Sequence, residues 1–138
     1  MQLIESKIIN PKVWELLSYA TTDGKIEAEY NAYLLSANRM LYGMIIKNNI
    51  VGCIGIEFDT ESKCEIKHIA VNPISRKQQI GRSMILYIIE KFQIDSIFAE
   101  TDKDAVNFYA SIGFTITSLG EKYPGVERFL CVFNNRKM

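Results

Sequence analysis

The sequence has few of the residues that build disulfide frameworks and metal clusters. Cysteine occurs three times in 138 residues, at Cys53, Cys64 and Cys131, and histidine occurs once. The cysteine count is odd, no CxxC pair occurs, and each cysteine lies in an apolar or strand-like stretch. A disulfide framework or a zinc site is therefore not expected. Three buried thiols in a reducing compartment are the simpler interpretation, and no bound metal is predicted.

The sequence also lacks an excess of charge of either sign and any long apolar run. Lys+Arg and Asp+Glu number 16 each, so the formal net charge is zero. Proteins that bind duplex nucleic acid usually carry a basic excess or stripe, and none is found here. The N-terminus lacks a basic start followed by an apolar run, and no segment approaches the roughly 18 apolar residues of a membrane span. We expect a cytoplasmic protein that binds neither nucleic acid nor a membrane.

What the sequence does contain is enough apolar surface for one core. Hydrophobic residues make up 48% of the chain. A chain of this length suits one domain. No internal repeat, low-complexity stretch or linker is visible, and Gly and Pro are scattered along the sequence. Residues 1–138 are therefore predicted to form a single domain.

The periodicity of the apolar residues predicts a mixed α/β chain in the order β-α-α-β-β-β-α-β-α-β-β. Asn10 reads as an N-cap, with Pro11 at the first helical position. Thr101 and Asp104 have the spacing of a capping box, and Gly113 is well placed to end the helix that starts there. Strands 63–71 and 94–100 flank a helix and should be parallel. The other predicted elements are strands 2–6, 40–46, 50–58, 114–119 and 128–133, and helices 11–20, 26–36 and 82–92.

The segment after strand 63–71 runs through a polar turn into a helix. Residues 75–82 read Ser-Arg-Lys-Gln-Gln-Ile-Gly-Arg. The backbone N–H groups at a helix start are unsatisfied and the helix dipole is positive there, so this turn suits a pyrophosphate. Arg76, Lys77 and Arg82 add positive charge. An ordinary helix start, with Ser75 and Gln78 as its capping box, explains the same residues, and this segment alone favours that interpretation.

A second segment changes the balance. Residues 104–114 read Asp-Ala-Val-Asn-Phe-Tyr-Ala-Ser-Ile-Gly-Phe. Together the two segments resemble the acetyl-CoA signature of the GNAT superfamily of N-acetyltransferases, in which a loop of the form Q/R-x-x-G-x-G/A opens the central helix. A later helix in that family carries a tyrosine and ends in Gly-Phe, as Tyr109, Gly113 and Phe114 do here. The resemblance covers about residues 51–133.

The resemblance implies a GNAT-like α/β fold, classed as α+β by some schemes, and acetyl-CoA as cosubstrate. In that fold a mixed central sheet of six or seven strands is flanked by about four helices, with a splayed parallel pair at the centre. The pantetheine arm would lie in the splay and the pyrophosphate against residues 78–82. Gln79 replaces the first loop glycine, and Asp102 stands where many members have Asn. The implied cofactor-binding residues are Ile69, Val71, Arg76, Lys77, Gln78, Gln79, Ile80, Gly81, Arg82, Asp102 and Tyr109.

The family's chemistry implies roles for three kinds of group. An acetyl group would move to a primary amine by direct attack through a tetrahedral intermediate. The oxyanion of that intermediate needs a fixed N–H donor, and by position we propose that of Val71, with Ile69 beside it. Tyr109, with an unperturbed pKa near 10, is the candidate general acid for the leaving thiolate.

The general base is less clearly indicated. Glu65 lies eleven residues before Arg76, a spacing that matches the catalytic glutamate of the histone-acetylating branch of the family. Strand alternation places it on the side of Lys67, Ile69 and Val71. A surface carboxylate paired with a neighbouring lysine is an equally good interpretation of Glu65.

Two other carboxylates and the single histidine are further candidates for the base. Glu57 and Glu100 are weaker candidates than Glu65. His68 has the opposite parity to Val71 and is interpreted as a packed, structural histidine.

The acceptor amine is the least defined partner. In this family the N-terminal helices and the last strand pair select it, and here they contain Tyr19, Tyr30, Tyr33 and the loop 120–125. Such aromatic residues suit a cationic amine. A small-molecule amine is favoured over a protein, so the expected partners are acetyl-CoA and a small-molecule or peptide amine, and a monomer or homodimer is expected. The alternatives to an enzyme are an acyl-CoA sensor that has lost turnover and an interaction domain that binds no ligand.

Overall fold

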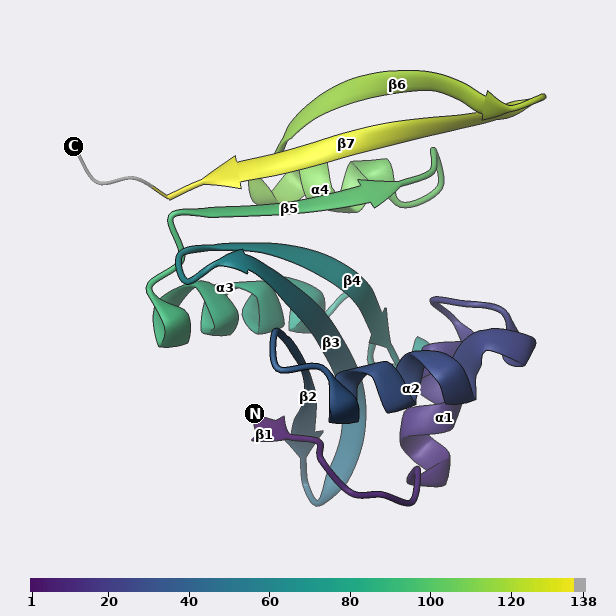
Figure 1. The fold of residues 1–138 in the computed structure, drawn as a ribbon, viewed down its shortest axis with the longest axis vertical. Coiled ribbons are helices and arrows are strands. Elements are labelled where there is room, and N and C mark those ends of the chain that lie inside the picture. Colours follow the sequence, from purple (N-terminus) through teal and green to yellow (C-terminus); the bar gives the residue numbers. More distant parts are fainter. Residues whose placement is uncertain (136–138) are drawn as a thin grey trace.

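The computed structural model describes residues 1–135, which form one seven-stranded sheet with helices on both faces (Figure 1). The strands lie across the sheet in the order β1-β2-β3-β4-β5-β7-β6. The elements are β1 (Gln2–Leu3), α1 (Pro11–Ser18), η1 (Asp23–Lys25), α2 (Ile26–Leu35), β2 (Arg39–Ile46), β3 (Asn49–Thr60), β4 (Lys63–Val71), η2 (Pro73–Ser75), α3 (Ile80–Phe92), β5 (Ser96–Thr101), α4 (Val106–Ile112), β6 (Thr115–Tyr123) and β7 (Val126–Asn134).

The element order, the mixed sheet and the four α-helices agree with the fold class predicted from the sequence. The Asn10 cap is confirmed, since its side-chain oxygen accepts a hydrogen bond of 2.8 Å from the backbone N–H of Lys12. The first strand is shorter than predicted. β5 begins at Ser96 rather than Ile94, because the backbone N–H of Ile94 still bonds to the carbonyl of Ile89 at the end of α3.

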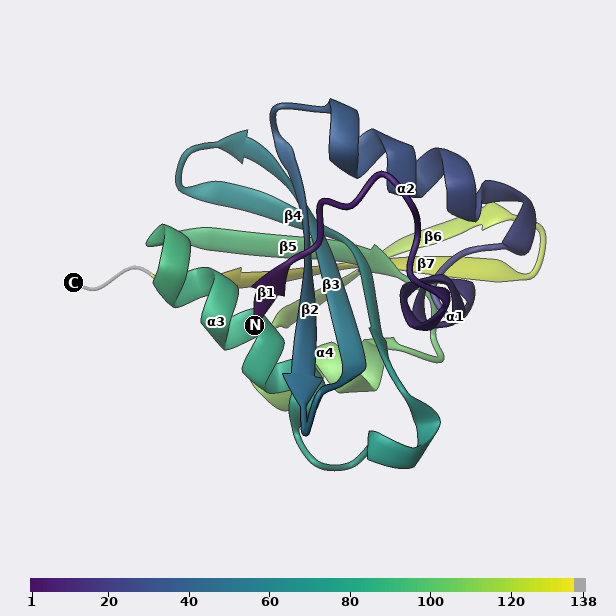
Figure 2. The same ribbon diagram turned by 90° about the horizontal axis from the view of Figure 1, so that it is seen from below.

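The sheet separates two apolar cores. Helices α1 and α2 pack on one face, and α3 and α4 on the other (Figure 2). Adjacent strand residues alternate between the cores: Cys53 belongs to the core under α1 and α2, and Ile54 to the core under α3. A strand buried on both faces reads as a continuous apolar run, which is why β3 shows no polar alternation.

A β-bulge in β4 changes which face each of its residues occupies. Gly55 of β3 pairs with His68 and Ile56 pairs with Ile66, so Lys67 is an extra residue on β4. One inserted residue reverses the alternation beyond it. Ile66 before the bulge and Ile69 after it therefore both pack against the core of α3.

Strands β4 and β5 are parallel neighbours that separate along their length. Their ladder comprises only the pairs Lys63–Ser96, Cys64–Ile97 and Glu65–Phe98. Beyond them β5 continues to pair with β7 as far as Thr101, whereas β4 bends away (Figure 1). The splayed central pair predicted from the sequence is confirmed.

Candidate active site

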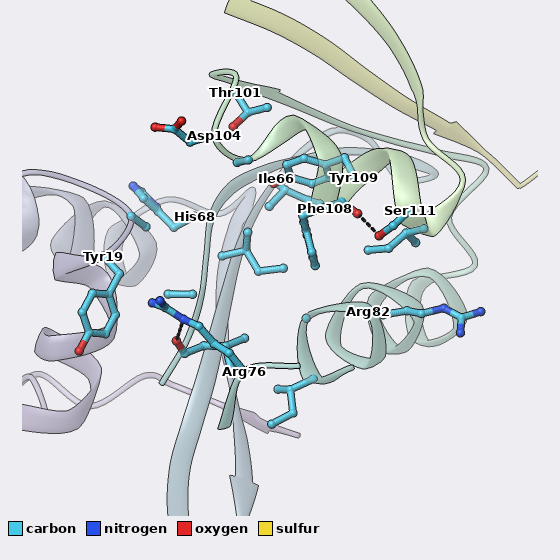
Figure 3. A pocket seen from close by; sticks show the side chains of 18 of the residues that line it. Tyr19, Ile66, His68, Arg76, Arg82, Thr101, Asp104, Phe108, Tyr109 and Ser111 are labelled. Carbon is cyan, nitrogen blue, oxygen red and sulfur yellow. Dashed lines mark hydrogen bonds between the residues drawn. The ribbon is translucent and has the colours of Figure 1, made fainter. Parts of the chain in front are cut away.

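The splay between β4 and β5 opens into a large cavity. Its volume is about 910 Å³, within the range of small-molecule sites. The walls come from β4, from the loop that enters α3, and from α4 (Figure 3). Of the residues predicted to bind acetyl-CoA, only Gln78 does not line it. Those that do are Ile69, Val71, Arg76, Lys77, Gln79, Ile80, Gly81, Arg82, Asp102 and Tyr109.

The entry to α3 differs from the capping box predicted for Ser75 and Gln78. Ser75 belongs to the short 3₁₀ helix η2, which Asn72 caps through a hydrogen bond to the N–H of Ile74. Helix α3 begins at Ile80, two residues earlier than predicted, and no side chain caps it. Its first N–H groups are therefore left for another acceptor.

Two residues of this loop adopt the left-handed conformation. Lys77 has φ of 67° and Gln79 has φ of 63°. Such residues turn successive N–H groups toward one concave side, which is a common way to hold an anion. The first turn of α3 carries Arg82 and no acidic residue. A cation near the positive end of the helix dipole destabilises the helix slightly, but it adds to the attraction of that end for an anion.

Arg76 lies on the cavity wall but its guanidinium is already engaged. Its Nε donates a hydrogen bond of 3.0 Å to the carbonyl of Val71, and its Cζ lies 5.2 Å from the ring centre of Tyr19, the residue that follows α1. Figure 3 shows Arg82 pointing out from α3, away from this pair. The two arginines therefore occupy different ends of the site.

The close approach of α3 and α4 depends on Gly81. A Cβ on Gly81 would lie 2.8 Å from two ring atoms of Phe108. Phe108 also packs edge-on against Tyr109, with ring centres 5.0 Å apart. The absence of a side chain at Gly81 thus lets an aromatic wall form beside the loop.

The backbone of β4 faces the splay at the predicted oxyanion position. The N–H of Asn72 donates to the carbonyl of Val51 on β3 over 2.7 Å. Because successive N–H groups of a strand point in opposite directions, the N–H of Val71 points away from β3 and toward the opening. The ladder with β5 stops at Glu65, so no β5 residue pairs with Ile69 or Val71.

Tyr109 sits on the short helix α4, whose end at Gly113 is confirmed by a φ of 107° there. Its ring is buried between Phe108 and Phe114, and 4% of the residue is exposed. Burial, and next the Cys131 thiol, raise the pKa of the Tyr109 hydroxyl. No hydrogen bond of this hydroxyl is found within residues 1–135, and Tyr109 lines the cavity.

The comparisons with known proteins agree with this arrangement. The family model described as an acetyltransferase (GNAT) domain matches residues 29–116, which is more than half of the chain. The chain belongs to the GNAT acetyltransferase family.

One curated relative is an uncharacterized N-acetyltransferase from Bacillus methanolicus. It is 36% identical over 61 residues, 44% of this chain, and the match spans about half (51%) of the relative's length.

Two solved structures share the fold. An aminoglycoside 6′-N-acetyltransferase complexed with coenzyme A has a TM-score of 0.81 at 16% identity, with 100% of this chain and 99% of that one covered. A GNAT family acetyltransferase from Elizabethkingia anophelis with acetyl-CoA bound has a TM-score of 0.73 at 20% identity, with 96% and 95% covered.

In this GNAT chain the β5–α4 loop is organised by Asp102, not by the capping box predicted for Thr101 and Asp104. The Asp102 carboxylate accepts hydrogen bonds from the backbone N–H groups of Asp104 (3.0 Å) and Ala105 (3.2 Å). Helix α4 then begins at Val106. The Asp102 carboxylate on the cavity wall therefore holds the backbone of the loop that leads into α4.

The carboxylates considered as bases lie in different surroundings. The bulge overturns the parity argument for Glu65: it pairs with Glu57 on the α2 side, does not line the cavity, and lies 3.7 Å from Lys67 Nζ. Glu57 bonds to Arg39.

Glu100 lines the cavity but is held by two cations, Lys122 at 2.9 Å and Arg128 at 3.6 Å. The hydrogen bond from Lys122 is the largest effect on the pKa of the Glu100 carboxyl and lowers it; desolvation raises it, and the charges of Lys122 and Arg128 lower it further, so the net shift is downward. It is therefore a poor proton acceptor.

The residues expected to select the acceptor divide into two groups. Tyr19 lines the cavity, where Figure 3 shows it beside Arg76 and on the same side of the opening as His68. Tyr30 and Tyr33 are buried in the core under α1 and α2. No residue of the loop 120–125 lines the cavity.

Sequence reasoning missed Phe108 and Arg128 as wall residues. The aromatic run before Gly113 is the signal that could have indicated Phe108.

Among residues 1–135, no helix is long and apolar enough to cross a membrane, and no cluster of His, Cys, Asp or Glu could hold a metal ion.

Proposed function

We propose that this protein transfers the acetyl group of acetyl-CoA to a primary amine by direct attack. The observation that carries the proposal is that three features line one cavity. They are the splayed β4–β5 pair, the uncapped start of α3 with two left-handed residues before it, and the buried ring of Tyr109. Three buried free thiols support the reducing, cytoplasmic setting expected from the sequence.

The residues of the cavity fit acetyl-CoA. The uncapped N–H groups from Gln79 onward would receive the pyrophosphate, with Lys77 and Arg82 supplying charge. The unpaired backbone of Ile69 would bond the amides of the pantetheine arm, as an added strand would. At Val71 the carbonyl already accepts from Arg76, and the N–H stays available for the thioester end. Acetyl-CoA would then present its thioester to the wall that carries Tyr109.

Each chemical step needs one group of this chain. As the amine nitrogen attacks the thioester carbon, the N–H of Val71 would stabilise the oxyanion. When the C–S bond breaks, Tyr109 would give its proton to the thiolate. A non-catalytic acyl-CoA sensor would bind the same cosubstrate without needing that donor. Glu65 stays a candidate base, and from outside the cavity it would have to act through water.

The acceptor screen is the experiment that tests acetyl transfer. We expect thiol release from acetyl-CoA with at least one amine of a panel: an aminoglycoside with a 6′-amino group, spermidine, and a short peptide with a free N-terminus. A protein that binds acetyl-CoA but releases no thiol with any of them would be a sensor. A protein that gives neither calorimetric heat nor a thermal shift with acetyl-CoA would contradict the site as well.

Charge should contribute to acetyl-CoA binding. We expect Arg82→Ala to raise the Kd by about tenfold, the worth of one charge-assisted contact, and to flatten the dependence of Kd on salt. Lys12→Ala, which removes an exposed cation of α1 outside the cavity, is the matched control. Isothermal calorimetry from low to high salt measures both effects, and equal Kd values for the two variants would exclude a role for Arg82.

Gln79 holds a conformation that glycine adopts without cost. We expect Gln79→Gly to relieve roughly 1 kcal/mol of left-handed strain, and so to raise the melting temperature slightly without weakening acetyl-CoA binding. Gln78→Gly is the matched control, because Gln78 has no positive φ and the substitution there only adds unfolded-state freedom. A lower melting temperature for Gln79→Gly than for Gln78→Gly would contradict this account.

A further inference from the structure

A polar cluster under α2 reaches the same cavity from the other face of the sheet. His68, the single histidine of the chain, is the first residue after the β4 bulge, and it lines the cavity although only 8% of it is exposed. Its Nδ1 shares a hydrogen bond with the hydroxyl of Tyr33. Its Nε2 lies 3.9 Å from the Glu29 carboxylate. Tyr33 thus fixes one edge of the imidazole, and Glu29 lies near the other edge without a hydrogen bond to it.

The sequence builds this contact through a glycine. Gly55 lies directly opposite His68 in the β3–β4 ladder, and a Cβ on Gly55 would fall 1.9 Å from the Tyr33 oxygen. The hydroxyl therefore occupies space that any other residue would fill. Tyr33 is itself 5% exposed, so its ring leaves the imidazole little freedom to turn.

The surroundings keep His68 neutral. Burial, the largest effect, lowers the pKa of its imidazole; Glu29 raises the pKa, and Lys67 and Arg39 lower it. The result is a pKa below the ordinary value of 6.5, so the ring is unprotonated at neutral pH. The ionisable groups around it come from α2, β2, β3 and β4, and they are Glu29, Tyr33, Arg39, Glu57 and Lys67.

We propose that His68 is the general base that deprotonates the acceptor, and that Tyr33 and Glu29 are its positioning residues. With Nδ1–H donating to the Tyr33 oxygen, Nε2 presents a lone pair. It takes one proton from the acceptor ammonium, directly or through a water, and Glu29 stabilises the imidazolium that forms. This inference rests on the proposed acetyl transfer and deepens it.

The protons balance over one turnover. The ammonium loses a first proton to His68, which returns it to solvent. The second leaves the nitrogen as the amide forms, and through solvent it replaces the proton that Tyr109 gives to the thiolate. The sum is an amide, free CoA and one proton released. Among the groups considered as the base, His68 alone combines a place on the cavity wall with freedom from a bound cation.

The pH dependence of kcat/KM tests the proposal, using the panel amine with the highest kcat/KM. If neutral His68 takes a proton from the ammonium form of the acceptor, kcat/KM should be flat between the pKa of His68 and that of the amine. Below the pKa of His68, kcat/KM should fall tenfold per pH unit. His68→Gln keeps a partner for Tyr33 but cannot titrate. This variant should be roughly 10²–10⁴-fold slower at pH 7, and should gain tenfold per pH unit up to the pKa of the amine.

Several results would overturn the proposal. One is a parent and a His68→Gln variant with the same rates and the same pH profile. Another is a large loss in Glu65→Gln but not in His68→Gln. His68→Gln should bind acetyl-CoA with the parent Kd, which separates this proposal from the cosubstrate site. A parent that neither binds acetyl-CoA nor acetylates any panel amine is instead a failure of the proposed function.

A second variant decides the matter if His68→Gln does not fold. Glu29→Gln removes the carboxylate that attracts the imidazolium, so the pKa of His68 and the acid limb of kcat/KM should both move to lower pH. Because His68 is the only histidine, its ring signals give that pKa directly by NMR in the free protein. Glu27→Gln, on the exposed side of α2, is the control and should change neither. An NMR pKa that moves while the acid limb stays fixed would refute the role.

Discussion

Tyr109→Phe is expected to lower turnover by roughly 10²–10⁴-fold while acetyl-CoA binding and stability stay close to those of the parent. The substitution keeps the ring, which packs on Phe108 and Phe114, and removes only the hydroxyl. That hydroxyl makes no hydrogen bond within residues 1–135, so its loss leaves no partner unsatisfied. Thiol release and the melting temperature, measured on one preparation, check both parts.

The pH profile gives a second test of Tyr109. Burial raises the pKa of its hydroxyl above the usual value near 10, so the acid form persists across the neutral and mildly alkaline range. No loss of kcat/KM from deprotonation of Tyr109 is therefore expected below about pH 10. Tyr87→Phe on α3 is the control, since Tyr87 does not line the cavity. A Tyr109→Phe rate within a few-fold of the parent would assign the proton to water or another group.

The sequence predicted β4 over its observed length because turn residues bound it and its apolar positions alternate. It could not predict the bulge at Lys67, since Lys67 and His68 are both polar and one extra residue leaves no mark in such a pattern. That single residue decides that Glu65 and Val71 lie on opposite faces. The parity argument for Glu65 failed for this reason, and the position of His68 could be valued only once the neighbours on α2 were known.

Helix starts were the other weak point. A capping box is defined by spacing alone, and Ser75 with Gln78 has that spacing without its geometry. The actual entry to α3 uses a left-handed Gln79, which propensity disfavours. The splay of β4 and β5 came from resemblance to the family, because no local pattern says where a parallel ladder stops.

The length of the two strands of the β6–β7 hairpin was underestimated for a different reason. β6 runs to Tyr123 and β7 starts at Val126, whereas the sequence suggested a loop over 120–125. Most of β6 is exposed. A strand without a buried face shows no alternation of apolar and polar residues, so the polar run Gly-Glu-Lys there resembled a loop.

Gly55→Ala is expected to lower the melting temperature by roughly 3–10 °C, which corresponds to about 1–3 kcal/mol of overpacking in a domain of this size. The new methyl would fall 1.9 Å from the Tyr33 oxygen and 2.2 Å from its Cζ, so the buried ring must move. Gly24→Ala is the matched control, because a Cβ on Gly24 meets nothing within 4 Å. Thermal unfolding followed by circular dichroism measures both.

A double variant identifies the cause of that loss. Combining Gly55→Ala with Tyr33→Leu shortens the clashing side chain, so the pair should be less destabilised than the sum of the single changes by about 0.5–3 kcal/mol. The NMR signal of His68 should shift in Gly55→Ala, because the displaced Tyr33 hydroxyl no longer meets Nδ1. Additive losses of stability with an unchanged His68 signal would mean that Gly55 is needed for the strand itself and not to leave space for the Tyr33 hydroxyl.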